Sequence, residues 1–182
     1  MDVGRSGTSL RRAATVPRVT AADDPRSTDV IAPDDPRADD VRALLERHLA
    51  FANTHSRPED VHALDVDALV DPAVSFFGYR RAGVLLAVGA MKELDAGHAE
   101  IKSMHTAAEA RGQGVAAAVV DHLLALARSR GYTRVSLETG SMDAFLPARS
   151  LYATRGFTVC PPFADYPDSP NSICMTLPFL DG

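Results

Sequence analysis

The pattern of hydrophobic and polar positions changes close to Asp29. Residues 1–27 are rich in Arg, Ser, Thr and Ala and show almost no apolar periodicity. Such a segment cannot bury enough surface to offset the entropy lost on ordering, so we expect a disordered N-terminal tail. From residue 28 onward apolar positions recur at regular spacing. We therefore expect residues 28–182 to form a single domain.

A helical period follows the first short strand, "DVIA". In "PDDPRADDVRALLERHLAFAN", Asp35 is placed as an N-cap and Pro36 as the first helical residue. Apolar positions then recur at intervals of three and four residues, as on one face of an amphipathic helix: Val41, Leu44, Leu45, His48 and Leu49. The stretch "HALDVDALV" predicts a shorter second helix.

The next region has the period of two that is typical of strands. "AVSFFGYRRAGVLLAVGAMKEL" predicts a hairpin that turns between Arg81 and Gly83, and "HAEIKSMHT" predicts a third strand. Simple alternation there would place Ser103 and His105 on the face opposite Glu100. After it we predict a long helix from "GVAAAVV", a strand at "RVSLET", a helix over "AFLPARSLYATRG", and two strands at "FTVC" and "SICMTLPF".

Composition narrows the range of partners. With 19 basic and 24 acidic residues and a net charge of −5, the chain has no overall positive charge that would attract nucleic acid or a membrane surface. No apolar run approaches the roughly 18 residues of a membrane helix. Cys160 and Cys174 form no CxxC pair, so we expect both to be reduced thiols. The histidines do not have the spacing of metal ligands either, so we expect no metal site. The tail lacks the apolar segment of a secretory signal, which favours the cytoplasm.

The segment "RGQGVAA" carries the first candidate chemistry. Two glycines, Gly112 and Gly114, stand directly before the long helix and leave its first backbone amides unshielded. Those amides and the positive end of the helix dipole suit a diphosphate, and Arg111 adds a charged contact. The alternative is a loop whose glycines only satisfy turn geometry.

Two spaced motifs make the chain resemble the GNAT acyltransferase superfamily. The pattern Q/RxxGxG/A is met by Arg111, Gly114 and Ala116, and the downstream pattern AxxLYxxxGF is met by Ala148, Leu151, Tyr152, Gly156 and Phe157. The resemblance covers about residues 29–180 and is strongest to small bacterial N-acetyltransferases. It implies an α+β fold with α/β/α layers. Its mixed, mostly antiparallel sheet would have six to seven strands, a splayed central pair and about four flanking helices.

The resemblance also implies acetyl-CoA as co-substrate, without a metal. The pantetheine arm would follow the backbone of Met104, His105 and Thr106 in the gap between the splayed strands. The diphosphate would lie on the motif loop and helix start: Arg111, Gly112, Gln113, Gly114, Val115 and Ala116.

The implied catalytic residues are a proton donor and a base. Tyr152 matches the residue that protonates the leaving thiolate in many relatives, although a core tyrosine is the alternative. Glu100 and Glu138 are both candidates for the base, and the alternative for each is a solvated or salt-bridged strand carboxylate. For His105 we expect a positioning or structural role. Phe145 departs from the family pattern, because many relatives have an asparagine there that contacts pantetheine.

Acceptor recognition is expected outside the motifs. In "CPPFADYPDSPNS" an aromatic and acidic surface would recognise a cationic amine, unless the prolines only stiffen the link: Phe163, Asp165, Tyr166 and Asn171. Arg149 is expected either at the acceptor or a cofactor phosphate, or exposed on its helix. The second candidate wall is the segment 55–71.

These observations and the resemblance together predict acetyl transfer to a primary amine of a small molecule or amino acid, or of a peptide or protein, by direct attack in a ternary complex. An inactive acyl-CoA-binding regulatory module and an unrelated nucleotide-binding scaffold are the alternatives. We also expect a homodimer, which is common in such folds.

Overall fold

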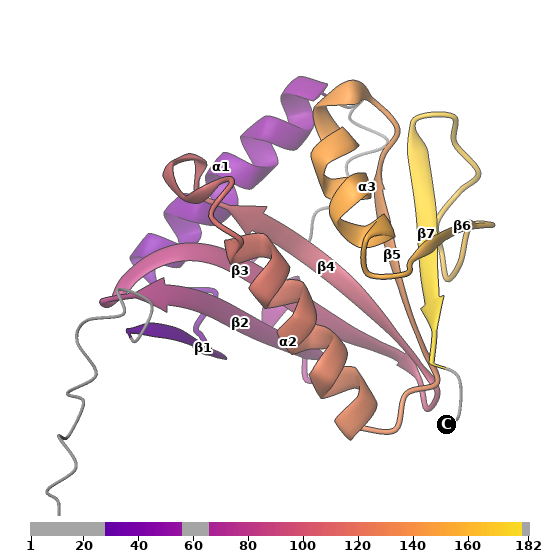
Figure 1. Cartoon of the computed structure of the whole chain (residues 1–182), viewed down its shortest axis with the longest axis horizontal. Helices are drawn as coiled ribbons and strands as arrows, with labels where there is room; N and C mark the ends of the chain where they lie inside the picture. Colours follow the sequence, from indigo (N-terminus) through magenta and orange to yellow (C-terminus); the bar gives the residue numbers. More distant parts are fainter. Residues whose placement is uncertain (1–27, 56–65, 180–182) are drawn as a thin grey trace, which may run out of the picture.

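A seven-stranded mixed sheet forms the centre of the protein (Figure 1). The computed structural model describes residues 28–55 and 66–179, so the expected tail and much of the second predicted helix lie outside the described residues. The sheet order is β1-β2-β3-β4-β5-β7-β6, and β4 with β5 is its parallel pair. The strands are β1 (Asp29–Pro33), β2 (Val74–Arg81), β3 (Val84–Asp95), β4 (His98–Thr106), β5 (Arg134–Gly140), β6 (Thr158–Cys160) and β7 (Ser172–Pro178).

Three α-helices are described: α1 (Asp39–His55), α2 (Val115–Ser129) and α3 (Leu146–Ala153). Short 3₁₀ turns stand at η2 (Ala68–Val70), η3 (Ala108–Ala110) and η4 (Asp143–Phe145). In Figure 1, α2 crosses the first half of the sheet and α3 lies along β5. This arrangement confirms the expected α+β fold, with one helix fewer than the expected four in the described ranges.

Helix α1 differs from its prediction at its start and at Leu49. The Asp35 carboxylate accepts the Arg37 amide at 2.9 Å, and the Asp35 carbonyl accepts the Ala38 amide at 3.0 Å. Asp35 therefore closes a turn, and the helix begins only at Asp39. Leu49 was predicted to face the core but is 43% exposed, because the inward stripe continues through Ala52 instead.

Strand β4 carries a β-bulge that the sequence pattern did not predict. Val88 pairs with His105 and Ala90 with Lys102, so the single residue Gly89 lies opposite two residues. Ser103 adopts φ +51°, in the left-handed region that one class of β-bulge uses. The bulge interrupts the alternation along β4, and His105 therefore shares a face with Lys102, contrary to the simple pattern.

Candidate functional site

Strands β4 and β5 separate halfway along their length. They pair from His98 with Arg134 to Ile101 with Leu137, while β5 continues against β7 as far as Gly140. A cavity of about 500 Å³, called the main cavity below, opens where the two strands diverge, and residues of both strands line it together with residues of α1, α2 and α3. This splayed pair is the gap that the resemblance to the GNAT superfamily implied.

The N-terminal end of α2 opens onto this cavity. Gly112 and Gly114 have φ of +73° and +78°, and a Cβ added to either would meet no atom within 4 Å. Within the described chain, neither glycine amide donates to a backbone carbonyl. The first amides of α2, beginning at Val115 and Ala116, have no carbonyl of a preceding turn to accept them. These groups form a cradle of donors that suits an anionic diphosphate.

Two predicted loop residues behave differently from each other. Arg111 lines the cavity, and its guanidinium lies 5.9 Å from the ring centroid of Phe51. Gln113 is not among the lining residues. Its side chain accepts from Arg81 at 2.8 Å and donates to the Glu109 carbonyl at 2.8 Å, so it fixes the loop from outside the cavity.

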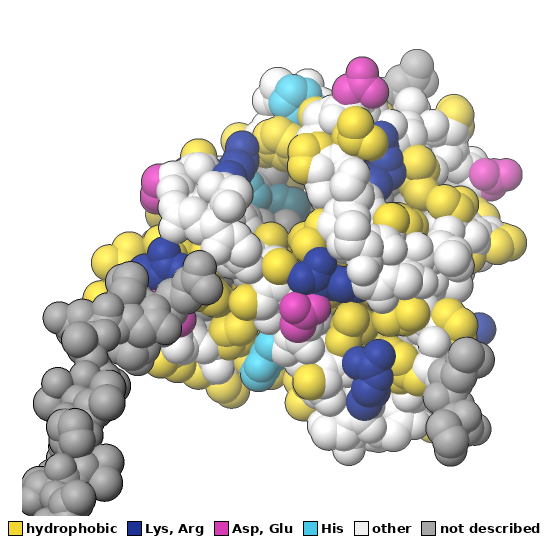
Figure 2. Space-filling view, in the orientation of Figure 1, with side chains coloured by type: hydrophobic (Ala, Val, Ile, Leu, Met, Phe, Trp, Pro, Cys, Tyr) yellow, Lys and Arg dark blue, Asp and Glu magenta, His cyan; other side chains and the backbone are white. Residues whose placement is uncertain are grey.

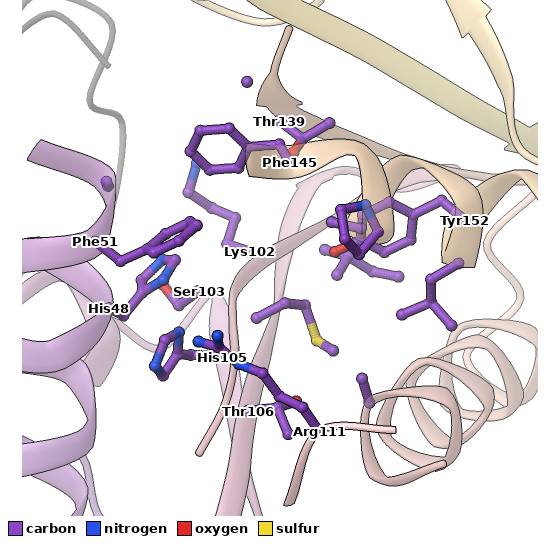
Figure 3. Close-up of a pocket in the computed structure, with 18 of the residues that line it drawn as sticks. His48, Phe51, Lys102, Ser103, His105, Thr106, Arg111, Thr139, Phe145 and Tyr152 are labelled. Atoms are coloured by element: carbon purple, nitrogen blue, oxygen red, sulfur yellow. The ribbon is translucent and has the colours of Figure 1, made fainter. Parts of the chain in front are cut away.

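Tyr152 lines the opposite wall, on α3 (Figure 3). It is 6% exposed and packs edge-on against Phe157, with ring centroids 5.8 Å apart. Burial raises the pKa of the Tyr152 hydroxyl, and the negative charge of Glu138 raises it further. The phenol therefore stays protonated at neutral pH, as a proton donor must.

The two predicted carboxylates both line the cavity but have different partners. Glu100 accepts from the ammonium of Lys102 at 2.8 Å and from the hydroxyl of Tyr166 through a short hydrogen bond. Both side chains of this ion pair are buried, at 3% exposure for Glu100 and 9% for Lys102. Glu138 accepts from the Ser172 hydroxyl at 2.7 Å. The salt-bridged alternative thus describes Glu100, and a paired carboxylate is the weaker base.

Lys102 is a cavity residue that the sequence analysis missed. The signal was present, since residues two apart on a strand share a face and a buried carboxylate needs a cation nearby. His48 of α1 is the second cavity residue that the sequence analysis missed. The bulge places His105 on the sheet face that α1 covers, next to His48, and the sequence pattern did not predict the bulge. The rings of His48 and His105 are 5.0 Å apart.

These two imidazoles are neutral at neutral pH. Burial lowers the pKa of His48. It lowers the pKa of His105 to about 4, with smaller contributions from His48, Arg111 and Arg47. The pair therefore contributes polar, uncharged surface to the cavity.

The lowered pKa of His105 predicts an acid-sensitive fold. Between its unfolded value near 6.5 and its folded value of about 4, the unfolded chain binds more protons, so the unfolding free energy falls as pH falls through this window. Urea unfolding at about pH 7 and about pH 4.5 measures the loss. His105→Asn should reduce this pH dependence, whereas His55→Asn, at an exposed site on α1, should keep it. Equal pH dependence in all three proteins would contradict the assignment.

Phe145 and Arg149 shape the end of the cavity beside β5. A Cβ added to Gly140 would lie 2.5 Å from the Phe145 ring, so this ring packs directly on the strand backbone. Arg149 donates to the carbonyls of Gly140 at 2.6 Å and Met142 at 2.9 Å. Arg149 therefore holds the turn after β5 and is neither the exposed side chain nor the acceptor contact that we expected.

The predicted acceptor residues do not form one surface. Tyr166 lines the main cavity, whereas Phe163 and Asp165 line a second cavity of about 900 Å³ under the β6–β7 loop. Glu100, Lys102 and Tyr166 line both cavities. Asn171 lines neither, and its carbonyl accepts the Ser141 amide at 3.0 Å.

The space-filling view shows where the main cavity opens. In Figure 2 the surface is hollowed between the end of β4 and α3, with a histidine visible inside. In residues 28–55 and 66–179 no group of three metal-ligating side chains occurs, and no described helix is long and apolar enough to cross a membrane. Cys160 and Cys174 are free thiols on neighbouring strands.

Comparison with known proteins places this geometry among acetyltransferases. Residues 39–157 match the family described as Acetyltransferase (GNAT) family. The chain is 47% identical to the uncharacterised N-acetyltransferase YsnE of Bacillus subtilis, over 75% of this chain and 90% of the relative. It is 41% identical to the uncharacterised N-acetyltransferase YedL of Escherichia coli, over 75% and 86%.

Solved structures have the same fold. A candidate acyl-CoA N-acyltransferase from Klebsiella pneumoniae superposes with a TM-score of 0.72 at 26% identity, covering 85% of this chain and 99% of the other. A GNAT acetyltransferase from Elizabethkingia anophelis, crystallised with acetyl-CoA bound, gives a TM-score of 0.61 at 15% identity, covering 83% and 98%. At that identity the second likeness shows the fold alone.

Proposed function

This chain belongs to the GNAT acetyltransferase family and is an N-acetyltransferase, and we propose that it transfers the acetyl group of acetyl-CoA to a primary amine of a small molecule or amino acid. One observation carries the proposal. A single cavity joins the open amides before α2 to Tyr152 and Glu138, so a diphosphate, a thioester and an amine all find partners along one path. Residues 28–182 would act as one domain in the cytoplasm.

The loop before α2 fits the diphosphate of acetyl-CoA. Gly112 and Gly114 leave room where any side chain would stand, and the amides of Val115 and Ala116 point from the positive end of the helix. Arg111 adds a charge at the cavity edge. The pantetheine arm would run along the Met104–Thr106 backbone toward the acetyl end.

The chemistry requires two proton transfers. The neutral amine attacks the thioester carbonyl, a C–N bond forms, and the C–S bond breaks. Glu138, whose carboxylate accepts the neutral Ser172 hydroxyl at 2.7 Å, takes the proton that the acceptor ammonium must lose before it can attack, directly or through water. Tyr152 gives a proton to the departing thiolate. We assign Glu100 to the positioning of Lys102 and Tyr166.

Exchanging the two carboxylates for amides separates their roles. Glu138→Gln should lower kcat on the order of 100-fold near neutral pH while the acetyl-CoA Kd stays unchanged, because the amide cannot accept the proton. The loss should shrink as pH rises toward the pKa of the acceptor amine. Glu93→Gln is the matched control, since that carboxylate binds Tyr132 outside the main cavity. An unchanged kcat in Glu138→Gln would remove it as the base.

A panel of amines tests the reaction itself. The protein is incubated with acetyl-CoA and amino acids, monoamines, polyamines and short peptides with free N-termini, and thiol release is followed together with product mass. We expect turnover with a small amine. Tight acetyl-CoA binding without turnover on any amine would instead describe the regulatory module, and preference for peptides would shift the acceptor class.

A further inference from the structure

We propose that the acceptor is a primary amine that carries an aromatic ring, and that Phe51, Phe145 and His48 receive this ring. The inference rests on the proposed function and names its substrate class. It differs from the cationic acceptor expected from the sequence. The residues that suggested a cationic acceptor do not gather in one cavity, since Phe163 and Asp165 line only the second and Asn171 lines neither, whereas the three rings named here all line the main cavity.

Phe51, Phe145 and His48 form an aromatic slot in the main cavity, and its residues come from two of the cavity walls. Phe51 comes from α1 and Phe145 from η4, and their rings meet edge to face with centroids 5.3 Å apart. Phe145 is held in place by its contact with Gly140, whose carbonyl is in turn bound by Arg149. Figure 3 shows both rings on the side of the cavity away from Tyr152.

Two buried polar atoms beside the slot have no hydrogen-bond partner within the described residues. They are His48 Nδ1 and Ser103 Oγ, and both residues line the cavity. Ser103 is 9% exposed, and the bulge in β4 sets its direction. Burying a polar atom without a partner costs free energy, so we expect a polar atom of a ligand or a bound water to form a hydrogen bond with each of these two atoms. Small side-chain movements would let an uncharged group on the acceptor ring, such as a hydroxyl, do so.

The charges around the cavity disfavour a polycation. Its lining contains two carboxylates, Glu100 and Glu138, and two cations, Lys102 and Arg111. Lys102 already compensates Glu100, and the guanidinium of Arg111 already lies over Phe51. The carboxylate of Glu138 serves the reacting ammonium, so the acceptor end offers no further carboxylate to hold a second ammonium group, while its rings offer face and edge contacts to a flat group.

The test compares two amines with the same carbon skeleton, one with an aromatic and one with a saturated ring. For the intact chain, we expect kcat/KM for 2-phenylethylamine to exceed that for 2-cyclohexylethylamine, with tyramine at least as good and spermidine poorer. Phe145→Leu and Phe51→Leu should each reduce the ratio between the first two amines by roughly two- to tenfold, because each removes a ring contact. Phe163→Leu, in the second cavity, should leave the ratio unchanged.

The outcomes separate this inference from the proposed function. Equal rates for the aromatic and saturated amines, or a preference for spermidine, overturn the aromatic acceptor while acetyl transfer to amines stands. An unchanged ratio in both leucine variants, each checked for native circular dichroism and acetyl-CoA affinity, overturns the assignment of the slot. Failure of every amine in the panel overturns the proposed function first.

Discussion

Gly114→Glu is expected to weaken acetyl-CoA binding by at least about 100-fold, a loss that corresponds to roughly 3 kcal/mol. Gly114 stands directly before α2 at φ +78°, and the space where its side chain would be is empty. A glutamate fills that space and brings a negative charge to the position proposed for the diphosphate. Calorimetric titration with CoA measures the loss.

Gly131→Glu provides a closely matched control. Gly131 also has a positive φ, +80°, and no atom within 4 Å of an added Cβ, but it follows the C-terminal end of the same helix. The two variants therefore add the same charge and a similar backbone strain at opposite ends of α2. CoA affinity should be normal in Gly131→Glu. Equal losses in both variants would mean that strain, and not the diphosphate site, causes the effect.

Tyr152→Phe is expected to lower kcat by on the order of 100-fold to 10,000-fold, with little change in acetyl-CoA affinity. Only the hydroxyl is lost, and the ring keeps its edge contact with Phe157. Because burial and Glu138 raise the pKa of this hydroxyl, the donor is protonated throughout the usual assay range and adds no basic limb to the pH profile there.

Tyr132→Phe controls for the removal of a buried phenol. Tyr132 is also 6% exposed, and its hydroxyl donates to Glu93 at 2.8 Å outside the main cavity. That variant should lose stability but keep kcat. Stopped-flow or steady-state rates of thiol release compare the two proteins. A wild-type kcat in Tyr152→Phe would mean that the leaving thiolate takes its proton from water or from another group.

Local chemistry made the strands, the long helix and the glycine loop predictable. The hairpin at Arg81–Gly83 and the three-strand meander follow from alternating apolar residues and a turn glycine. The start of α2 follows from Gly114, whereas the splayed pair was expected from the resemblance to the GNAT superfamily. The strands, the turn and the helix start depend on residues that are close together in the chain, so the sequence pattern is enough to predict them.

The parts that the sequence did not predict depend on contacts between distant segments. A bulge at Ser103 is decided by pairing with Gly89, and it moves His105 toward His48 on α1. The spacing of Glu100 and Lys102 on β4 could have indicated their ion pair, but the contact of Tyr166 with both side chains comes from the distant β6–β7 loop. The arrangement of residues at the acceptor end of the main cavity could therefore not be predicted from local sequence patterns.

A crystal structure of the complex with acetyl-CoA tests the central claim most directly. We predict diphosphate oxygens within hydrogen-bond distance of the amides of Gly112, Gly114 and Val115, and the sulfur within reach of the Tyr152 hydroxyl. A complex in which that loop holds no phosphate, or in which the sulfur lies far from Tyr152, would contradict the account.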